Sequence, residues 1–298
     1  MRKLVRIAIF LFLAAASLLS TSALAHPGSG IEIDRTGQIF FLDTGSGLWK
    51  LDTLGKLTHL SRLRYHWMAL DAKNQFTSTR LSSSSGDISK AGANPTTLIS
   101  SDYPIAVGQD GNFYYPSGTT SGVRLMRVSP SGASSVFATL PATISGRLLQ
   151  HLNGLTAGPE NSLYYTENNA IRRISQEGRV STVATVPALP NGPSIPGTDQ
   201  HPYLRGLAVD SNGVMYVADN GDARVLKITP DGKITTLVQT QSPWAPTAVA
   251  LYGSDVYVNE FSHTPSDNRT EWMPRIRKIT ADGKSTIILT VDQMPGAR

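Results

Sequence analysis

The chain repeats one short pattern along its length. In residues 207–219, alternating apolar residues lead to an aspartate, two spacers and a glycine, and a second apolar run then ends in another aspartate. The same pattern stands at residues 31–43 and 105–117, and a looser copy stands at 155–167. Repetition of this kind indicates several copies of one supersecondary unit that stack against each other. It constrains the fold more than any other feature of the sequence.

Six copies of this unit can be placed, starting near residues 30, 66, 103, 151, 203 and 244. Each copy is expected to hold four short strands, because Val, Ile, Leu and Tyr alternate with polar residues. In the fifth copy these strands are predicted at 206–210, 214–218, 224–229 and 234–239. Turn dipeptides such as Asn212-Gly213 and Asp231-Gly232 separate them and tolerate a positive φ.

The second copy is the weakest. Residues 66–71 and 74–76 keep its first half, and Arg80 aligns with the end of its second strand. Residues 82–95 are rich in Ser and Gly, and 82–85 are expected to form a solvated loop. Helical periodicity is absent after the first 25 residues. Four-stranded antiparallel units repeated around an axis form a β-propeller. We therefore predict an all-β fold, a six-bladed propeller of four-stranded antiparallel blades over residues 26–298. The predicted ring closes by packing of units one and six, since no strand is left over to be exchanged between the ends.

Residues 1–25 have the layout of a cleaved secretory signal peptide. Arg2, Lys3 and Arg6 precede an apolar run at 7–19, and Ala23-Leu24-Ala25 fits the cleavage rule. The apolar run is short for a bilayer span. We expect a periplasmic or secreted protein that begins at His26 and has no membrane span after cleavage.

The composition limits the kinds of molecule that the protein is expected to bind. Without the signal peptide, Lys and Arg fall from 27 to 24 against 22 Asp and Glu, which leaves a formal charge of +2. So small a charge argues against nucleic acid as a partner. The chain has no cysteine, so its stability comes from a packed core, which a chain of this length can bury. No segment indicates an oligomer interface, and we expect a monomer.

The repeats resemble a known family. Residues 172–182 and 224–234 are similar to the second halves of NHL repeats, and 206–213 are similar to a first half. The likeness covers most of residues 30–291. It implies the propeller fold but not an activity, because related propellers serve as ligand scaffolds, lactonases and lyases.

Long insertions single out one face of the predicted ring. Residues 141–150, 187–202 and 261–274 fall either between units or after a second strand, and these positions share one face of a propeller. The turns on the opposite face stay short. A rigid ring with its long loops on one side is suited to binding, although long surface loops are also tolerated without a function.

Aligned repeat positions give the residues expected around the channel mouth on that face. The second strands end at Asp43, Arg80, Ser117, Glu167, Asp219 and Glu260, and the innermost strands are entered by His66, Tyr103, His151, Asn153, Arg205 and Trp244. Neighbouring carboxylates raise one another's pKa or recruit a cation. Asp43 and Asp219 precede turns that they could simply cap, whereas both interpretations stay open for Glu167 and Glu260. The candidate ligand-binding residues are His66, Arg80, Tyr103, His151, Asn153, Glu167, Arg205, Trp244 and Glu260, and a divalent cation such as calcium would take Asn153, Glu167 and Glu260.

A second resemblance concerns activity. Asn153-Gly154-Leu155 is similar to the Asn-Gly-Leu motif of the six-bladed, calcium-dependent gluconolactonase/regucalcin family. The resemblance implies a metal held by a first-blade Glu, this Asn and an Asp of the next blade. Here the first-blade Glu aligns roughly with Ser29, with Glu32 nearby, and Arg205 stands where the Asp would fall.

Three functions follow from these patterns. The first is an exported NHL-type propeller that binds a small ligand or a partner protein on the long-loop face. The alternative is a metal-dependent lactonase or hydrolase of the gluconolactonase-like group, with its site at the mouth of the central channel. A lyase is the third, without a motif of its own. Gly-x-Ser-x-Gly, His-Glu-x-x-His and P-loop motifs are absent from the sequence, and no catalytic residue is assigned.

Overall fold

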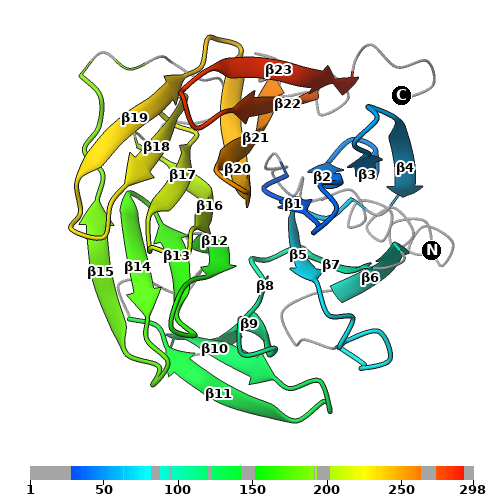
Figure 1. The fold of residues 1–298 in the computed structure, drawn as a ribbon. Coiled ribbons are helices and arrows are strands. Elements are labelled where there is room, and N and C mark those ends of the chain that lie inside the picture. Colours follow the sequence, from blue (N-terminus) through cyan, green and yellow to red (C-terminus); the bar gives the residue numbers. More distant parts are fainter. Residues whose placement is uncertain are drawn as a thin grey trace, which may run out of the picture.

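Six β-sheets surround a central axis in the computed structural model of the chain (Figure 1). The structure describes residues 28–62, 64–81, 88–93, 96–119, 122–141, 152–190, 192, 202–262 and 273–291. The prediction of an all-β, six-bladed propeller is confirmed. The expected signal peptide, residues 1–25, lies outside the described residues. Within the described ranges we find no helix long and apolar enough to cross a membrane.

Five of the sheets are antiparallel blades of four strands, with consecutive strands paired from the axis outward. Their strands are β1 (Ile31–Ile33), β2 (Ile39–Asp43), β3 (Gly47–Leu51) and β4 (Leu57–Ser61) in the first blade; β8 (Ala106–Val107), β9 (Phe113–Thr119), β10 (Gly122–Val128) and β11 (Ser134–Thr139) in the third; β12 (Leu152–Ala157), β13 (Leu163–Glu167), β14 (Ala170–Ile174) and β15 (Val180–Thr185) in the fourth; β16 (Leu204–Val209), β17 (Met215–Asp219), β18 (Arg224–Ile228) and β19 (Ile234–Gln239) in the fifth; and β20 (Trp244–Tyr252), β21 (Asp255–Ser262), β22 (Pro274–Ile279) and β23 (Ser285–Thr290) in the sixth.

The second blade differs from the prediction. Its inner strand β5 (Trp67–Asp71) pairs directly with β7 (Thr96–Ser101), and β6 (Ile88–Ala93) lies outside β7. The predicted second strand ending at Arg80 is wrong, because residues 77–80 form no strand. The Ser- and Gly-rich stretch 82–95 contains the whole of β6, and the loop predicted at 82–85 lies outside the described residues. The reason is burial: all six residues of β7 are buried, whereas residues 77–80 are polar and mostly exposed.

The repeated Asp-x-x-Gly pattern exists because each blade needs the same turn between its first two strands. In the first blade, Oδ1 of Asp34 accepts hydrogen bonds from the amides of Thr36 (2.8 Å) and Gln38 (3.1 Å). Gly37 stands between them at a φ of 82°, a conformation that glycine adopts without strain. The carboxylate therefore fixes the turn, and the turn fixes the register of β1 against β2.

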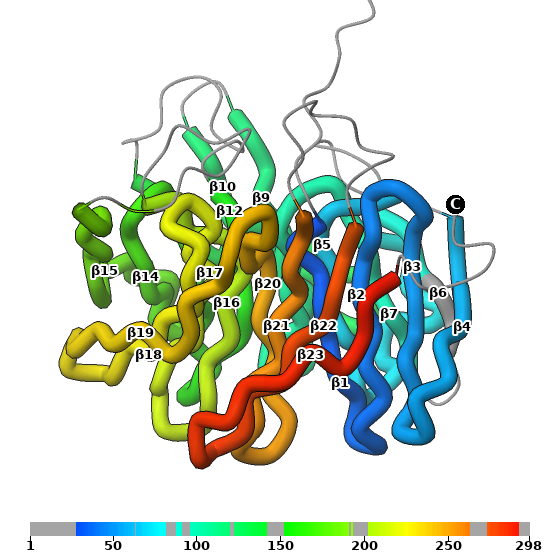
Figure 2. Tube along the Cα trace, turned by 90° about the horizontal axis from the view of Figure 1, so that it is seen from above, coloured from blue at the N-terminus to red at the C-terminus, as the bar shows by residue number. Residues whose placement is uncertain are grey.

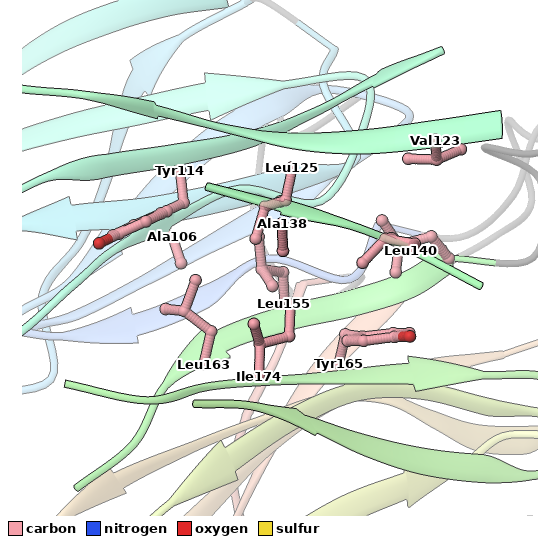
Figure 3. Packing of buried hydrophobic residues seen from close by; sticks show 11 residues of the cluster. Ala106, Tyr114, Val123, Leu125, Ala138, Leu140, Leu155, Leu163, Tyr165 and Ile174 are labelled. Atoms are coloured by element: carbon pink, nitrogen blue, oxygen red, sulfur yellow. The ribbon is translucent and has the colours of Figure 1, made fainter. Parts of the chain in front are cut away.

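Apolar residues fill the space between neighbouring blades. Figure 3 shows Tyr114, Leu125 and Ala138 of the third blade facing Leu155 and Ile174 of the fourth. The same kind of packing closes the ring. Residues of the first blade, Phe41 and Trp49 among them, pack with Ala248, Tyr257 and Ile276 of the sixth. Closure by side-to-side packing is therefore confirmed.

One end of the ring carries the sites of the predicted insertions. Figure 2 shows the ring edge-on, with the ends of β9 and β10 on the upper side and the β22–β23 turn on the lower side. In an antiparallel blade, the start of the innermost strand and the end of the second strand lie at the same end. The connections β11–β12, β15–β16 and β21–β22, which contain the insertions, therefore all meet one end of the channel, here called the mouth.

Candidate ligand site at the mouth of the central channel

Arg205 lies at the centre of a bonded network at the mouth. It is the second residue of β16, and only 2% of its surface is exposed. Its Nε donates a hydrogen bond to Oγ of Ser29 at 3.0 Å, and the Ser29 amide donates to the carbonyl of His66 at 2.6 Å. Oγ1 of Thr166 donates to the Arg205 carbonyl at 2.7 Å. Hydrogen bonds of Arg205 and Ser29 thus link residues from four blades.

Burial lowers the pKa of Arg205, and the nearby Tyr203 opposes this effect. A guanidinium keeps its proton at any pH that the protein experiences. The mouth therefore contains a positive charge that water scarcely reaches.

Asn153 is the second buried polar residue of the mouth, with 4% of its surface exposed. It lies at an irregularity in the pairing of β12 with β13. Its Oδ1 accepts from the hydroxyl of Tyr203 at 3.1 Å, and its carbonyl accepts from Nε1 of Trp67 at 3.0 Å. Its Nδ2 is buried and has no hydrogen-bond partner among the described residues. Leaving a buried donor unpaired is costly, so this atom marks a place where a ligand oxygen would be favourable.

His66 provides a third polar group at the mouth. Its Nδ1 lies 3.1 Å from Oδ1 of Asp102, while its Nε2 is buried and has no hydrogen-bond partner in the part of the chain that the structure describes. A carboxylate beside Nδ1 favours a proton on that nitrogen and leaves the Nε2 lone pair as an acceptor.

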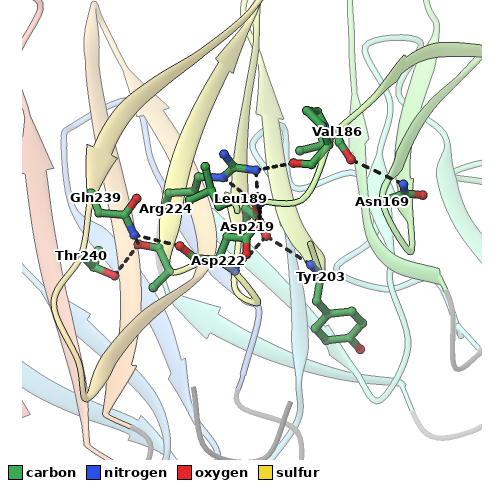
Figure 4. Close-up of polar contacts among 11 residues, drawn as sticks. Asn169, Val186, Leu189, Tyr203, Asp219, Asp222, Arg224, Gln239 and Thr240 are labelled. Carbon is green, nitrogen blue, oxygen red and sulfur yellow. Dashed lines mark hydrogen bonds and ion pairs between the residues drawn. The ribbon is translucent and has the colours of Figure 1, made fainter. Parts of the chain in front are cut away.

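Three of the four strand-end carboxylates predicted to surround the channel are bound by arginines of the next strand. Glu167 accepts from Nε of Arg172 at 3.1 Å, and Asp219 accepts from Nε of Arg224 at 2.8 Å (Figure 4). Glu260 accepts from two arginines, 275 and 277. These carboxylates therefore stabilise the edges of their own blades.

Asp43 and Asp219 have different hydrogen-bond partners. Asp43 accepts from the Gly45 amide at 2.9 Å and from the hydroxyl of Ser46, which is the turn-capping role. Burial raises the pKa of Asp219, and the hydrogen bond from Arg224 opposes the rise. The same arginine donates to Asp222 at 3.2 Å and to the Pro187 carbonyl at 2.8 Å.

The remaining candidates lie in different surroundings. Tyr103 is buried in the core, with its ring centroid 6.5 Å from that of Tyr115. Trp244 stacks under the guanidinium of Arg275, 4.1 Å from its carbon. Arg80 is exposed and stands outside any strand. His151 lies outside the described residues.

A cavity of about 180 Å³ occupies the channel beyond the mouth, and residues of every blade line it. Ser29 and Trp67, which belong to the network at the mouth, are among these residues. A small molecule at the mouth would therefore adjoin a hollow rather than a filled core.

The metal site that the resemblance implies can be tested against these residues. The positions expected to hold its ligands, Ser29, Asn153 and Arg205, do meet at the mouth. Ser29 provides a neutral hydroxyl, however, and Arg205 provides a cation, whereas calcium prefers carboxylate and carbonyl oxygens. In the described part of the chain, no group of three or more His, Asp or Glu side chains could hold a metal ion. The residues present do not fit this metal.

The fold and the buried polar mouth define a six-bladed β-propeller with a small-molecule-sized channel opening. The sequence model of the SMP-30/Gluconolactonase/LRE-like region family matches residues 104–258, which is more than half of the chain. The chain belongs to this family, as the Asn-Gly-Leu motif indicated.

Solved structures with the same fold include three with assigned names. A gluconolactonase from Xanthomonas campestris is 14% identical, with a TM-score of 0.52 over 81% of this chain and 86% of that one. The calcium-binding protein regucalcin from Agrobacterium tumefaciens is 15% identical, with a TM-score of 0.50 over 78% and 81%. A virginiamycin B lyase from Staphylococcus aureus is 17% identical, with a TM-score of 0.50 over 89% and 85%. At such identities the likeness shows the fold alone. No curated protein sequence matches the chain.

Sequence reasoning did not anticipate the arginines that bind the strand-end carboxylates. A signal for them exists, because Arg172 follows Glu167 by five residues and Arg224 follows Asp219 by the same interval. It also did not anticipate Trp67 and Tyr203 as partners of Asn153. Those contacts join different blades, and no local pattern reports them.

Proposed function

We propose that the mouth of the channel binds a small anionic ligand. The Nδ2 of Asn153, which has no partner among the described residues, supports this proposal most. Asn153 accepts from Tyr203, which lies two residues before the buried Arg205. Together Asn153 and Arg205 offer donors and a positive charge, which suit a carboxylate or another oxygen anion. Both side chains are almost fully buried, so a small molecule is a better match than the flat surface of a partner protein.

The alternative is a metal-dependent lactonase, which membership of the family favours. Hydrolysis of a sugar lactone produces a hydroxy acid, so a site for a carboxylate is also compatible with product binding. The metal would need ligands other than Ser29 and Arg205. Binding without calcium and turnover with calcium are therefore the outcomes that separate the two functions.

The test uses gluconate as the anion and glucono-δ-lactone as the substrate. Calorimetric titration of gluconate in EDTA should show binding to the purified protein, weakened at least about tenfold in Arg205→Gln by loss of a charge-assisted hydrogen bond. Arg179→Gln is the matched control, since Arg179 is 79% exposed and pairs with Glu177 on a turn. Equal loss in both variants, or no binding of gluconate and other small carboxylates, contradicts the proposal. Hydrolysis that requires calcium favours the alternative.

We also propose that the protein is exported as a monomer. The support is the layout of residues 1–25, with basic residues before an apolar run and a cleavage sequence. N-terminal sequencing of the exported protein should begin at His26, and light scattering should give the mass of one mature chain. Retention of residues 1–25 would contradict export by this route.

A further inference from the structure

Glu32 is an isolated carboxyl group inside the propeller. It is the middle residue of β1, three residues beyond Ser29, and it lines the channel cavity. None of the other lining residues has an ionisable side chain. Among the described residues the carboxyl group has no hydrogen-bond or ion-pair partner, and burial alone perturbs it. Glu32 is partly buried, and a carboxyl group that faces a cavity without a protein partner is a candidate ligand for a cation.

Backbone oxygens of β1 face the same cavity. The Gly30 carbonyl accepts from the Leu42 amide at 3.0 Å, and the Asp34 amide donates across the turn at 3.0 Å. Alternate residues of an antiparallel strand bond to the same neighbour, so the even-numbered residues of β1 bind β2. The carbonyl and amide groups of Ile31 and Ile33 therefore point away from β2, toward the channel, and both residues line the cavity.

The turns of other blades show which backbone groups of their innermost strands face the channel. The Gly158 amide donates across its turn at 2.8 Å, and the Asp210 amide does so at 3.0 Å. By the same alternation, the backbone groups of Leu155, Leu207 and Val209 face the channel, and all three residues line the cavity. Each innermost strand is the edge of its sheet. The cavity is therefore surrounded by strand edges that present carbonyl oxygens from at least three blades.

These groups match the chemistry of an alkali metal ion. Carbonyl oxygens replace the hydration shell of K⁺ in ion channels, and one carboxylate neutralises one monovalent charge. A divalent ion would leave a positive charge uncompensated among apolar side chains, which is costly. We propose that Glu32 and the surrounding carbonyl groups bind one alkali metal ion, K⁺ or Na⁺, in the central channel. Such an ion would join the inner edges of several blades. Burial also raises the pKa of Glu32 to about 8, and a nearby cation would favour its ionised form.

The proposal predicts a stability that depends on the cation present. Protein dialysed into N-methyl-glucamine chloride is titrated with KCl, NaCl or CaCl₂ at constant ionic strength, and Tm is recorded. At a hundredfold excess over Kd, mass action should raise the Tm of the wild type by about 5 °C in K⁺ or Na⁺. The larger rise of the two salts identifies the preferred ion. Glu32→Gln should abolish the rise. Glu160→Gln should keep it, because Glu160 is 80% exposed and pairs with Arg173.

Several outcomes would overturn the proposal. They are a Tm that does not depend on the cation, an equal rise in Glu32→Gln, or a rise with calcium alone. A second measurement on the wild type does not depend on the folding of the variant. Crystals soaked in Tl⁺, which replaces K⁺, should show an anomalous peak beside the Glu32 carboxylate, and a channel without a peak refutes the site.

Discussion

The stability of this protein should fall as pH rises from about 5 to 8, and Glu32 should be the cause. Burial raises the pKa of Glu32 from 4.5 to about 8, so the folded protein keeps this proton over a range in which the unfolded chain loses it. The free energy of unfolding then decreases by about 1.4 kcal/mol per pH unit. Over the whole interval the loss is at most about 5 kcal/mol.

Glu32→Gln isolates this effect, because glutamine has nearly the same shape and no charge to lose. Urea denaturation of both proteins at pH 5 to 9, in EDTA and without alkali metal salts, gives the two free energies. Near pH 5 they should almost agree, and the variant should gain steadily up to pH 8 and then stay ahead. Glu160→Gln, at an exposed position, should follow the wild type. Parallel curves for wild type and Glu32→Gln would refute the buried, uncompensated carboxyl.

Three further results are expected. Arg224→Met should cost about 3–5 kcal/mol in urea denaturation, because it leaves two fully buried aspartates without their shared cation; a loss below about 1 kcal/mol would contradict this. Gly178→Ala should destabilise more than Gly55→Ala. Both glycines have a φ of 81°, but only at Gly178 would the new Cβ lie 2.3 Å from a backbone oxygen; equal losses of about 1–3 kcal/mol would show that strain alone acts. The double change Ser29→Glu with Arg205→Asp should gain calcium binding in calorimetry, since it restores two carboxylates at the mouth; a folded but inert double variant would contradict the assignment of these positions.

The sequence predicted the architecture because one local device recurs. Asp34 and Asp210 each fix a tight turn through their own side chains, and a feature formed within five residues is visible without tertiary information. The strand order of the second blade was not predicted, because it does not depend on a local turn of this kind. Its strand β7 does not follow such a turn. β7 belongs to the sheet because its residues are buried, and Leu98 and Ile99 pack in clusters with residues of neighbouring blades.

The candidate site could be predicted only in part. Repeat alignment brought Asn153 and Arg205 to the mouth, because the position along a strand sets the end at which a residue lies. Repeat alignment could not determine whether a carboxylate side chain points toward the channel or toward a neighbouring strand. Glu167 and Glu260 bind arginines of the adjacent strand, and this competition depends on side chains that meet across strands. Glu32 lies near the position of the family's first-blade Glu, but the sequence did not show that it lines a cavity.

A crystal structure with gluconate would show whether a cationic side chain occupies the family's metal position here and receives an anion. We expect a carboxylate within about 3 Å of both the Arg205 guanidinium and Nδ2 of Asn153. A divalent ion between Asn153 and Ser29, with Arg205 turned out of the mouth, would contradict it.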